Sequence, residues 1–191
     1  NICTAEALSA MMAGMYGVYH GAEGIRAIAE GVHGRAVYLS EMLQAYGYNQ
    51  ENTEFFDTLR ITRDEEGWVE RVREIAEEMG INLYYDPQGW VGLALDETVT
   101  IDDMNDLMEV FALASNNGVQ YEETEEAFEG LWAIDENRVR EVDYMQAEVF
   151  HLYHTETEMM RYLKRLDRKD ISLATSMIPL GSCTMKLNPA A

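Results

Sequence analysis

The chain has 191 residues and a formal net charge of −21, because 35 acidic side chains stand against only 14 basic ones. This balance argues against a nucleic-acid partner, since the phosphate backbone would be repelled. Apolar residues make up 47% of the chain, yet no apolar run approaches the roughly 18 residues that a membrane-spanning helix needs. We therefore expect a globular protein with neither a nucleic acid nor a membrane as its partner.

The basic residues are mostly arginine, and lysine occurs only at positions 164, 169 and 186. A lysine-poor acidic surface is typical of proteins that stay solvated at high salt, and a mesophilic source with an acidic surface is the equal alternative. The two cysteines, Cys3 and Cys183, stand at opposite ends of the chain and cannot form a disulfide framework. This cysteine usage favours a reducing compartment.

The first 47 residues predict two helices. Thr4 is a suitable N-cap for the first helix, which runs to about Tyr19. The run from His20 to Gly24 interrupts the pattern. Apolar residues at steps of three and four then predict a second helix from Ile25 to Tyr46. Gly47 stands where a helix-ending glycine is expected.

Residues 48–115 predict a small α/β domain with the order β-α-β-β-α. The first strand is indicated by apolar residues that alternate with polar ones from Phe55 to Ile61. Helical spacing follows from Trp68 to Met79. Two short strands, at 81–85 and 91–95, flank a turn at 86–89 and predict a hairpin. Thr100 then begins the last helix of this domain.

Residues 116–143 are rich in glutamate and predict a solvated linker or a short exposed helix. The region from 144 to 191 opens a further domain. It begins with an apolar stretch and a helix over 155–167, where Thr155 and Glu158 form a capping box. The apolar stripe of this helix is expected to be buried, and it consists of Met159, Tyr162, Leu163 and Leu166.

The segment from Ser176 to Pro189 is the most informative of the chain. It places hydroxyl, thiol and ammonium groups beside Gly181, in Ser182, Cys183, Thr184 and Lys186. Such a segment is too polar for a core strand and too apolar for a free tail. We expect a loop buried against a ligand or another domain, and we expect the chain to be an interior piece of a larger enzyme. A buried interface loop that satisfies its own polar groups is the equal alternative.

Histidines provide weaker signals. His154 precedes Glu156 and Glu158 and suits acid–base chemistry, but helix capping by Thr155 and Glu158 explains this run more simply. His151 and His154 are three residues apart, yet a metal site would need two more ligands, so no metal site is predicted. We interpret His20 and His33 as interhelical or surface histidines.

Five short runs of residues follow one another in a characteristic order: Asn1–Leu8, Phe55–Leu59, Leu93–Thr98, Tyr153–Glu158 and Lys169–Leu173. Together with the segment Ser176–Asn188, which is the most specific, they resemble the glycine decarboxylase P-protein family of the glycine cleavage system. The resemblance covers nearly the whole chain and is weakest in the acidic linker. Coincidence is a poor explanation for so many motifs in one order.

The resemblance implies an architecture. Members of the family are described as two related halves of the pyridoxal-phosphate (PLP) enzyme type, of which only the second holds the cofactor. Residues 1–47 would be the helical end of the first half, and residues 48–115 its small domain, similar to that of fold-type I PLP enzymes. Residues 116–143 would be an acidic linker, and residues 144–191 the start of the PLP-binding half.

The resemblance also implies an activity, which is PLP-dependent decarboxylation of glycine with transfer of the aminomethyl group to the lipoyl arm of the H-protein. The lysine that forms the Schiff base lies downstream of Ala191 in the family, so this chain alone is expected to be inactive. Candidates for lining the completed pocket are Ser182, Cys183, Thr184, Lys186 and His154.

Further expectations concern assembly and location. The whole protein would be a dimer of tandem halves, in the bacterial cytoplasm or, for a eukaryotic source, in the mitochondrial matrix. Gln146 and Ala147 replace the Thr-His pair usual in the family, and the sequence leaves the effect of this departure open. The competing hypothesis is a non-catalytic acidic α/β scaffold that binds a partner protein.

Overall fold

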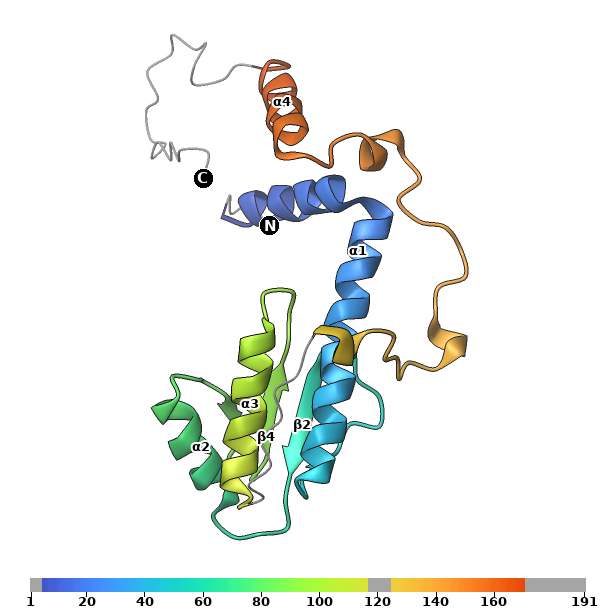
Figure 1. Cartoon of the computed structure of the whole chain (residues 1–191). Coiled ribbons are helices and arrows are strands. Elements are labelled where there is room, and N and C mark those ends of the chain that lie inside the picture. The colour runs from blue at the N-terminus through green and yellow to red at the C-terminus, as the bar shows by residue number, and fades with distance from the viewer. Residues whose placement is uncertain (1–4, 117–124, 171–191) are drawn as a thin grey trace, which may run out of the picture. The chain divides into compact units, whose positions relative to one another are not determined.

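The structure, a computed structural model, describes residues 5–116 and 125–170 (Figure 1). The chain divides into two compact units. The α/β unit is Ala22–Tyr144, and the helical unit is Asn1–Gly21 together with Met145–Ala191. None of the described helices is both long enough and apolar enough to cross a membrane.

Helix α1 (Ala5–Ala45) contributes one segment to each unit, because its backbone is not helical at Gly21. There φ is 64° and ψ is −175°, a combination that is essentially restricted to glycine. The predicted interruption at 20–24 is thereby confirmed and narrowed to one residue. The second segment ends as predicted, with Gly47 at a φ of 87° and its amide bonded to the carbonyl oxygen of Gln44 at 3.0 Å.

The α/β unit contains a four-stranded antiparallel sheet with the order β1-β2-β4-β3. The strands are β1 (Asn49–Gln50), β2 (Thr58–Thr62), β3 (Tyr84–Tyr85) and β4 (Val91–Ala94). With α2 (Trp68–Glu78) between β2 and β3, and α3 (Ile101–Ala114) after β4, the predicted β-α-β-β-α order is confirmed. The strands are shorter than predicted, and the two-residue β1 was not predicted.

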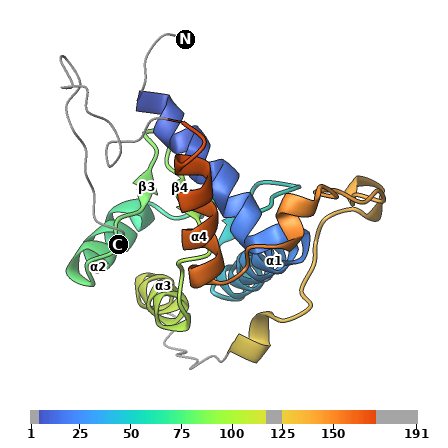
Figure 2. The same ribbon diagram turned by 90° about the horizontal axis from the view of Figure 1, so that it is seen from above.

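One face of this sheet is buried. Leu59 and Ile61 of β2 and Val91 and Leu93 of β4 are at most 2% exposed, as period-two alternation requires. They join a single core with α2, α3 and the second segment of α1. The two helices α2 and α3 lie next to each other in both views (Figure 1, Figure 2).

The helix ends follow local sequence signals. The hydroxyl of Thr100 accepts a hydrogen bond from the Asp103 amide, and the Asp103 carboxylate accepts one from the Thr100 amide at 2.7 Å. This reciprocal pair lowers the pKa of the Asp103 carboxyl, because the Thr100 hydroxyl and amide both donate to its charged form. In the helical unit, Thr155 likewise caps α4 (Glu156–Asp167) through the Glu158 amide.

The apolar stripe of α4 is less buried than predicted. Met159, Tyr162 and Leu166 are half-buried, and Leu163 is 39% exposed. Tyr162 owes its partial burial to Tyr153, whose ring stacks on it at a centroid distance of 4.2 Å. Among the described residues, none of the four stripe residues belongs to the hydrophobic core, which lies in the α/β unit.

The acidic segment differs from a solvated linker in its first described part. The short helix η1 (Glu125–Phe128) ends in Phe128, which is only 4% exposed and belongs to the core of the α/β unit. Residues 135–143, including η2 (Glu136–Arg138), are exposed, as the prediction had it. The two compact units divide the chain after residues 21 and 144. The sequence, in contrast, suggested domain boundaries at residues 47, 115 and 143.

Candidate functional site

Four of the five predicted pocket residues belong to a part of the chain that the structure does not describe. Ser182, Cys183, Thr184 and Lys186 lie outside the described residues, and only His154 lies within them. His154 belongs to the loop between η3 (Glu148–His151) and α4. The site can therefore be built from the residues around His154, from a cavity in the α/β unit, and from a buried histidine of that unit.

The imidazole of His154 is oriented by the backbone of α1. Its Nδ1 lies 2.6 Å from the carbonyl oxygen of Tyr19. A carbonyl oxygen can only accept a hydrogen bond, so Nδ1 carries the proton and Nε2 is an acceptor in the neutral ring. The candidate histidine is thus held in one tautomer, with Nδ1 occupied.

This bond is a consequence of the break at Gly21. A helix that stops leaves its last carbonyl oxygens without amide partners, and Tyr19 stands two residues before the break. The His154 side chain satisfies one of them. A Cβ at Gly21 would lie 2.7 Å from the carbonyl oxygen of Phe150 and 2.9 Å from Cε1 of His154. Glycine is therefore required both by the backbone angles and by the approach of this loop.

In the described ranges no group of three or more His, Cys, Asp or Glu side chains is placed to hold a metal ion. Among these residues, the pair His151 and His154 has no third side chain of the kind that a zinc site needs.

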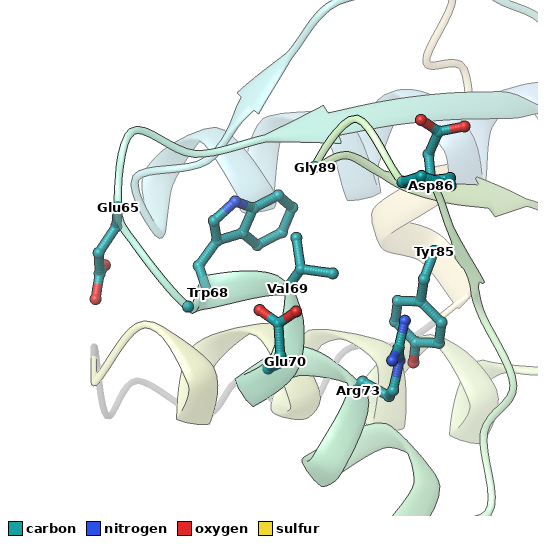
Figure 3. Close-up of a pocket in the computed structure, with 10 residues that line it drawn as sticks. Glu65, Trp68, Val69, Glu70, Arg73, Tyr85, Asp86 and Gly89 are labelled. Carbon is teal, nitrogen blue, oxygen red and sulfur yellow. The ribbon is translucent and has the colours of Figure 1, made fainter.

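The α/β unit has a cavity of about 380 Å³ between the start of α2 and the turn that joins β3 to β4 (Figure 3). Trp68 and Val69 contribute apolar surface to its lining. The polar groups of the lining come from five residues, which are Glu65, Glu70, Arg73, Tyr85 and Asp86.

Several of these polar groups already have partners. The carboxylate of Glu65 bonds to Arg71 and to Arg63, the latter at 2.7 Å, and these bonds lower the pKa of Glu65. The guanidinium of Arg73 lies 4.5 Å from the ring centre of Tyr85, and burial raises the pKa of that tyrosine. Asp86 accepts a bond from the Gln88 amide at 2.8 Å within the turn. The lining contains no pair of a nucleophile and a base, so the cavity indicates no reaction.

Sequence reasoning missed His33, which is neither a surface residue nor a simple interhelical contact. It is 0% exposed and bonded at both ring nitrogens. The only sequence signal of its burial was its position next to Val32, on the buried side of the second α1 segment. Its partners lie 23 and 100 residues away, and no local pattern reveals them.

The geometry of the described residues does not indicate a reaction, but comparison with known proteins identifies the family. The family described as glycine cleavage system P-protein has a model that matches residues 1–111, which is more than half of the chain. The chain belongs to this family. The motif resemblance found in the sequence is thereby confirmed, and the mixed helices and antiparallel sheet agree with it.

Relatives of the P-protein family match the chain over its whole length. A glycine dehydrogenase (decarboxylating) of Bacteroides thetaiotaomicron is 51% identical over 191 residues, and one of Bacteroides fragilis is 50% identical. The protein of the same name from Synechocystis sp. is 47% identical over 191 residues. The chain spans 20%, 20% and 19% of these three proteins, which is about a fifth of their length.

The described residues do not fit PLP, the cofactor implied by the resemblance. A Schiff-base lysine needs a desolvated pocket that lowers its pKa. Lys164 is 50% exposed and pairs with Asp167 at 2.5 Å, and Lys169 is exposed. Both lysines of the described ranges are thus exposed to solvent, and the cavity beside α2 has no lysine in its lining.

Proposed function

We propose that this chain is part of a P-protein that decarboxylates glycine, in which it closes the first half and opens the PLP-binding half. The observation that carries this proposal is the 51% identity over all 191 residues with a glycine dehydrogenase (decarboxylating) of which the chain spans 20%. The family match over residues 1–111 also supports it. The substrate, glycine, and the partner, the lipoyl-bearing H-protein, follow from that assignment.

In this proposal the cofactor is held elsewhere in the polypeptide. The exposed positions of Lys164 and Lys169 support this view, because a solvated ammonium group is a poor nucleophile for a cofactor aldehyde. PLP, when bound, supplies the electron sink for loss of the carboxyl group. The contribution of this chain is to form walls that orient the substrate and exclude water.

The proposal includes the assembly and the location expected from the sequence. The whole protein would be a dimer of tandem halves in the bacterial cytoplasm, and the bacterial relatives support such a source. The segment from 176 to 189, with Ser182 to Lys186, would line the pocket completed by the second half. Substitution of Ser182 by alanine in the whole protein should then lower decarboxylation without releasing PLP.

The central experiment compares the isolated chain with the longer polypeptide that contains it. Each is supplied with PLP, H-protein and glycine labelled in its carboxyl group, and the release of labelled CO2 is measured. The longer polypeptide should release CO2 only when H-protein is present, and the isolated chain should release none. Absence of release from a longer polypeptide that binds PLP would contradict the proposed function.

A further inference from the structure

His33 joins three separate segments of the α/β unit through one imidazole. Its Nδ1 lies 2.8 Å from the carbonyl oxygen of Phe56, and its Nε2 lies 3.0 Å from the amide nitrogen of Ala133. Because the carbonyl only accepts and the amide only donates, the ring is neutral with its proton on Nδ1. The second α1 segment, the loop before β2 and the chain after η1 thus meet at one buried side chain.

Aromatic contacts fix the ring in this position. His33 stacks on Phe56 with an interplanar angle of 4° and a centroid distance of 5.6 Å. Trp132 stands edge-on to the imidazole at 4.7 Å. Since Trp132 directly precedes Ala133, the ring contact and the amide hydrogen bond hold the same point of the chain.

A second contact lies one residue further along α1. A Cβ at Gly34 would overlap the carbonyl oxygen of Phe128, so the backbone of this segment approaches the helix where no side chain intervenes. The ring of Phe128 meets that of Tyr38 edge-on at 5.2 Å, and the guanidinium of Arg35 lies 5.7 Å from its centre. Phe128 is 4% exposed, so this is a packed contact.

We propose that residues 127–133, here called the clip, dock the connection between the two halves onto α1, and that His33 is the positioning residue that holds the clip. This proposal depends on the proposed function in one respect, which is that the connection leads from the first half of the protein to the PLP-binding half. The exposed stretch that follows the clip ends at Tyr144, whose hydroxyl donates to the carbonyl oxygen of Ala22 at 2.8 Å. The connection is thereby held at both of its ends on the second α1 segment.

The clip shortens the free connection. Residues 116–143 would form a tether of 28 residues if none of them were docked, whereas docking through Ala133 leaves only residues 134–143 free. The effective concentration of Tyr144 at its contact on α1 falls roughly as the −3/2 power of this length, so docking of the clip raises it about five-fold. His33 therefore acts on the second half through the chain and not by touching substrate.

Two substitutions at one position test the clip. Asparagine places its amide where Nδ1 stands and keeps donation to Phe56, whereas glutamine reaches the place of Nε2 and can still accept from Ala133. Hydrogen exchange of the Ala133 amide, measured by mass spectrometry on the 191-residue chain, should accelerate about ten-fold in His33→Asn, because its partly buried hydrogen bond to the ring is lost. It should stay close to the parent rate in His33→Gln. Equal exchange in the two variants would overturn the proposal.

A second pair on α1 makes the test independent of His33. Alanine is a better helix former than glycine, so Gly34→Ala and Gly14→Ala both favour the helix. Only the first places a methyl group against the clip carbonyl, because a Cβ at Gly14 meets nothing within 4 Å. Exchange at Ala133 should accelerate in Gly34→Ala and not in Gly14→Ala. Protection of Ala133 in both variants would refute the docking.

The positioning role is measured in the longer polypeptide. His33→Asn should lower the rate of H-protein-dependent decarboxylation by up to about five-fold at an unchanged PLP absorbance. His33→Gln should keep the rate of the parent polypeptide. An unchanged rate in His33→Asn, with fast exchange at Ala133, would disprove the positioning role. If the parent polypeptide does not decarboxylate glycine at all, the proposed function fails, while exchange at Ala133 still decides whether the clip exists.

Discussion

The two units of the molecule carry similar apolar patterns and bury them to different extents. In the second segment of α1, Leu39 and Leu43 are 0% exposed, because the sheet, α2 and α3 share one core with that segment. In the first segment, Leu8, Met11 and Met12 are 54%, 58% and 64% exposed. Both segments have helical spacing of apolar residues. The difference shows that a stripe becomes a core only where other elements cover it.

The same substitution in each unit tests this difference most strongly. Leu39→Ala removes a fully buried side chain and should cost about 2–5 kcal/mol of unfolding free energy. Leu163→Ala, on the 39% exposed position of α4, should cost less than about 1 kcal/mol. Urea unfolding of the 191-residue chain, followed by circular dichroism, measures both. Similar losses at the two positions would mean that α4 is buried to the same extent as α1.

Two glycines of the helical unit provide a matched pair of alanine substitutions that differ in backbone geometry. Gly21→Ala forces a side chain into a φ of 64° and against the carbonyl oxygen of Phe150, at a cost of about 1–3 kcal/mol. Gly14→Ala has open space around its new Cβ and should gain roughly 0.5–1 kcal/mol from helix propensity.

Thermal unfolding monitored by far-ultraviolet circular dichroism distinguishes these two variants. The melting temperature should fall for Gly21→Ala and rise for Gly14→Ala. Loss of stability in both variants would show that the first α1 segment is constrained along its whole length and not only at the break.

Tyrosine ionisation gives a smaller effect that is confined to the α/β unit. Burial raises the pKa of Tyr48 from 10.0 to about 12, although the nearby Arg63 opposes the shift. The unfolded chain therefore loses this proton first, and stability that is fully present below pH 10 declines as the pH rises toward 12. At pH 11 the loss attributable to Tyr48 should be about 1 kcal/mol.

The variant Tyr48→Phe isolates that contribution. At pH 8 it should be less stable than the parent by about 1 kcal/mol, because the hydroxyl donates to the carbonyl oxygen of Phe111 at 3.0 Å. At pH 11 the gap should close, since phenylalanine does not ionise. The gap is measured by urea unfolding with tryptophan fluorescence, and a gap that is the same at both pH values would contradict the assignment.

Much of the α/β unit was predictable from local patterns. The helices of residues 68–78 and 101–114 follow apolar spacing, and Thr100 caps the second of them as predicted. Strand β2 follows strict alternation, so the buried residues Leu59 and Ile61 were correctly placed. Strand β1 was missed because two residues are too few to show a period.

The candidate site was less predictable. The sequence named His154 as a pocket-lining candidate, a role that stays a prediction, and gave no sign of its partner Tyr19, which lies 135 residues away. His33 was misjudged because its partners come from distant segments, and Phe128 was assigned to a solvated linker because glutamates surround it in the sequence. The four candidates from Ser182 to Lys186 stay predictions.

The sequence by itself determined the family, the helix ends and the order of the elements, because motifs, caps and glycines act within a few neighbouring residues. Only the tertiary structure decided which apolar stripes are buried and which carbonyl and amide groups two histidines bind. Burial and such bonds require surfaces from segments far apart in the chain, and the free energy of bringing them together is not encoded in any single stretch.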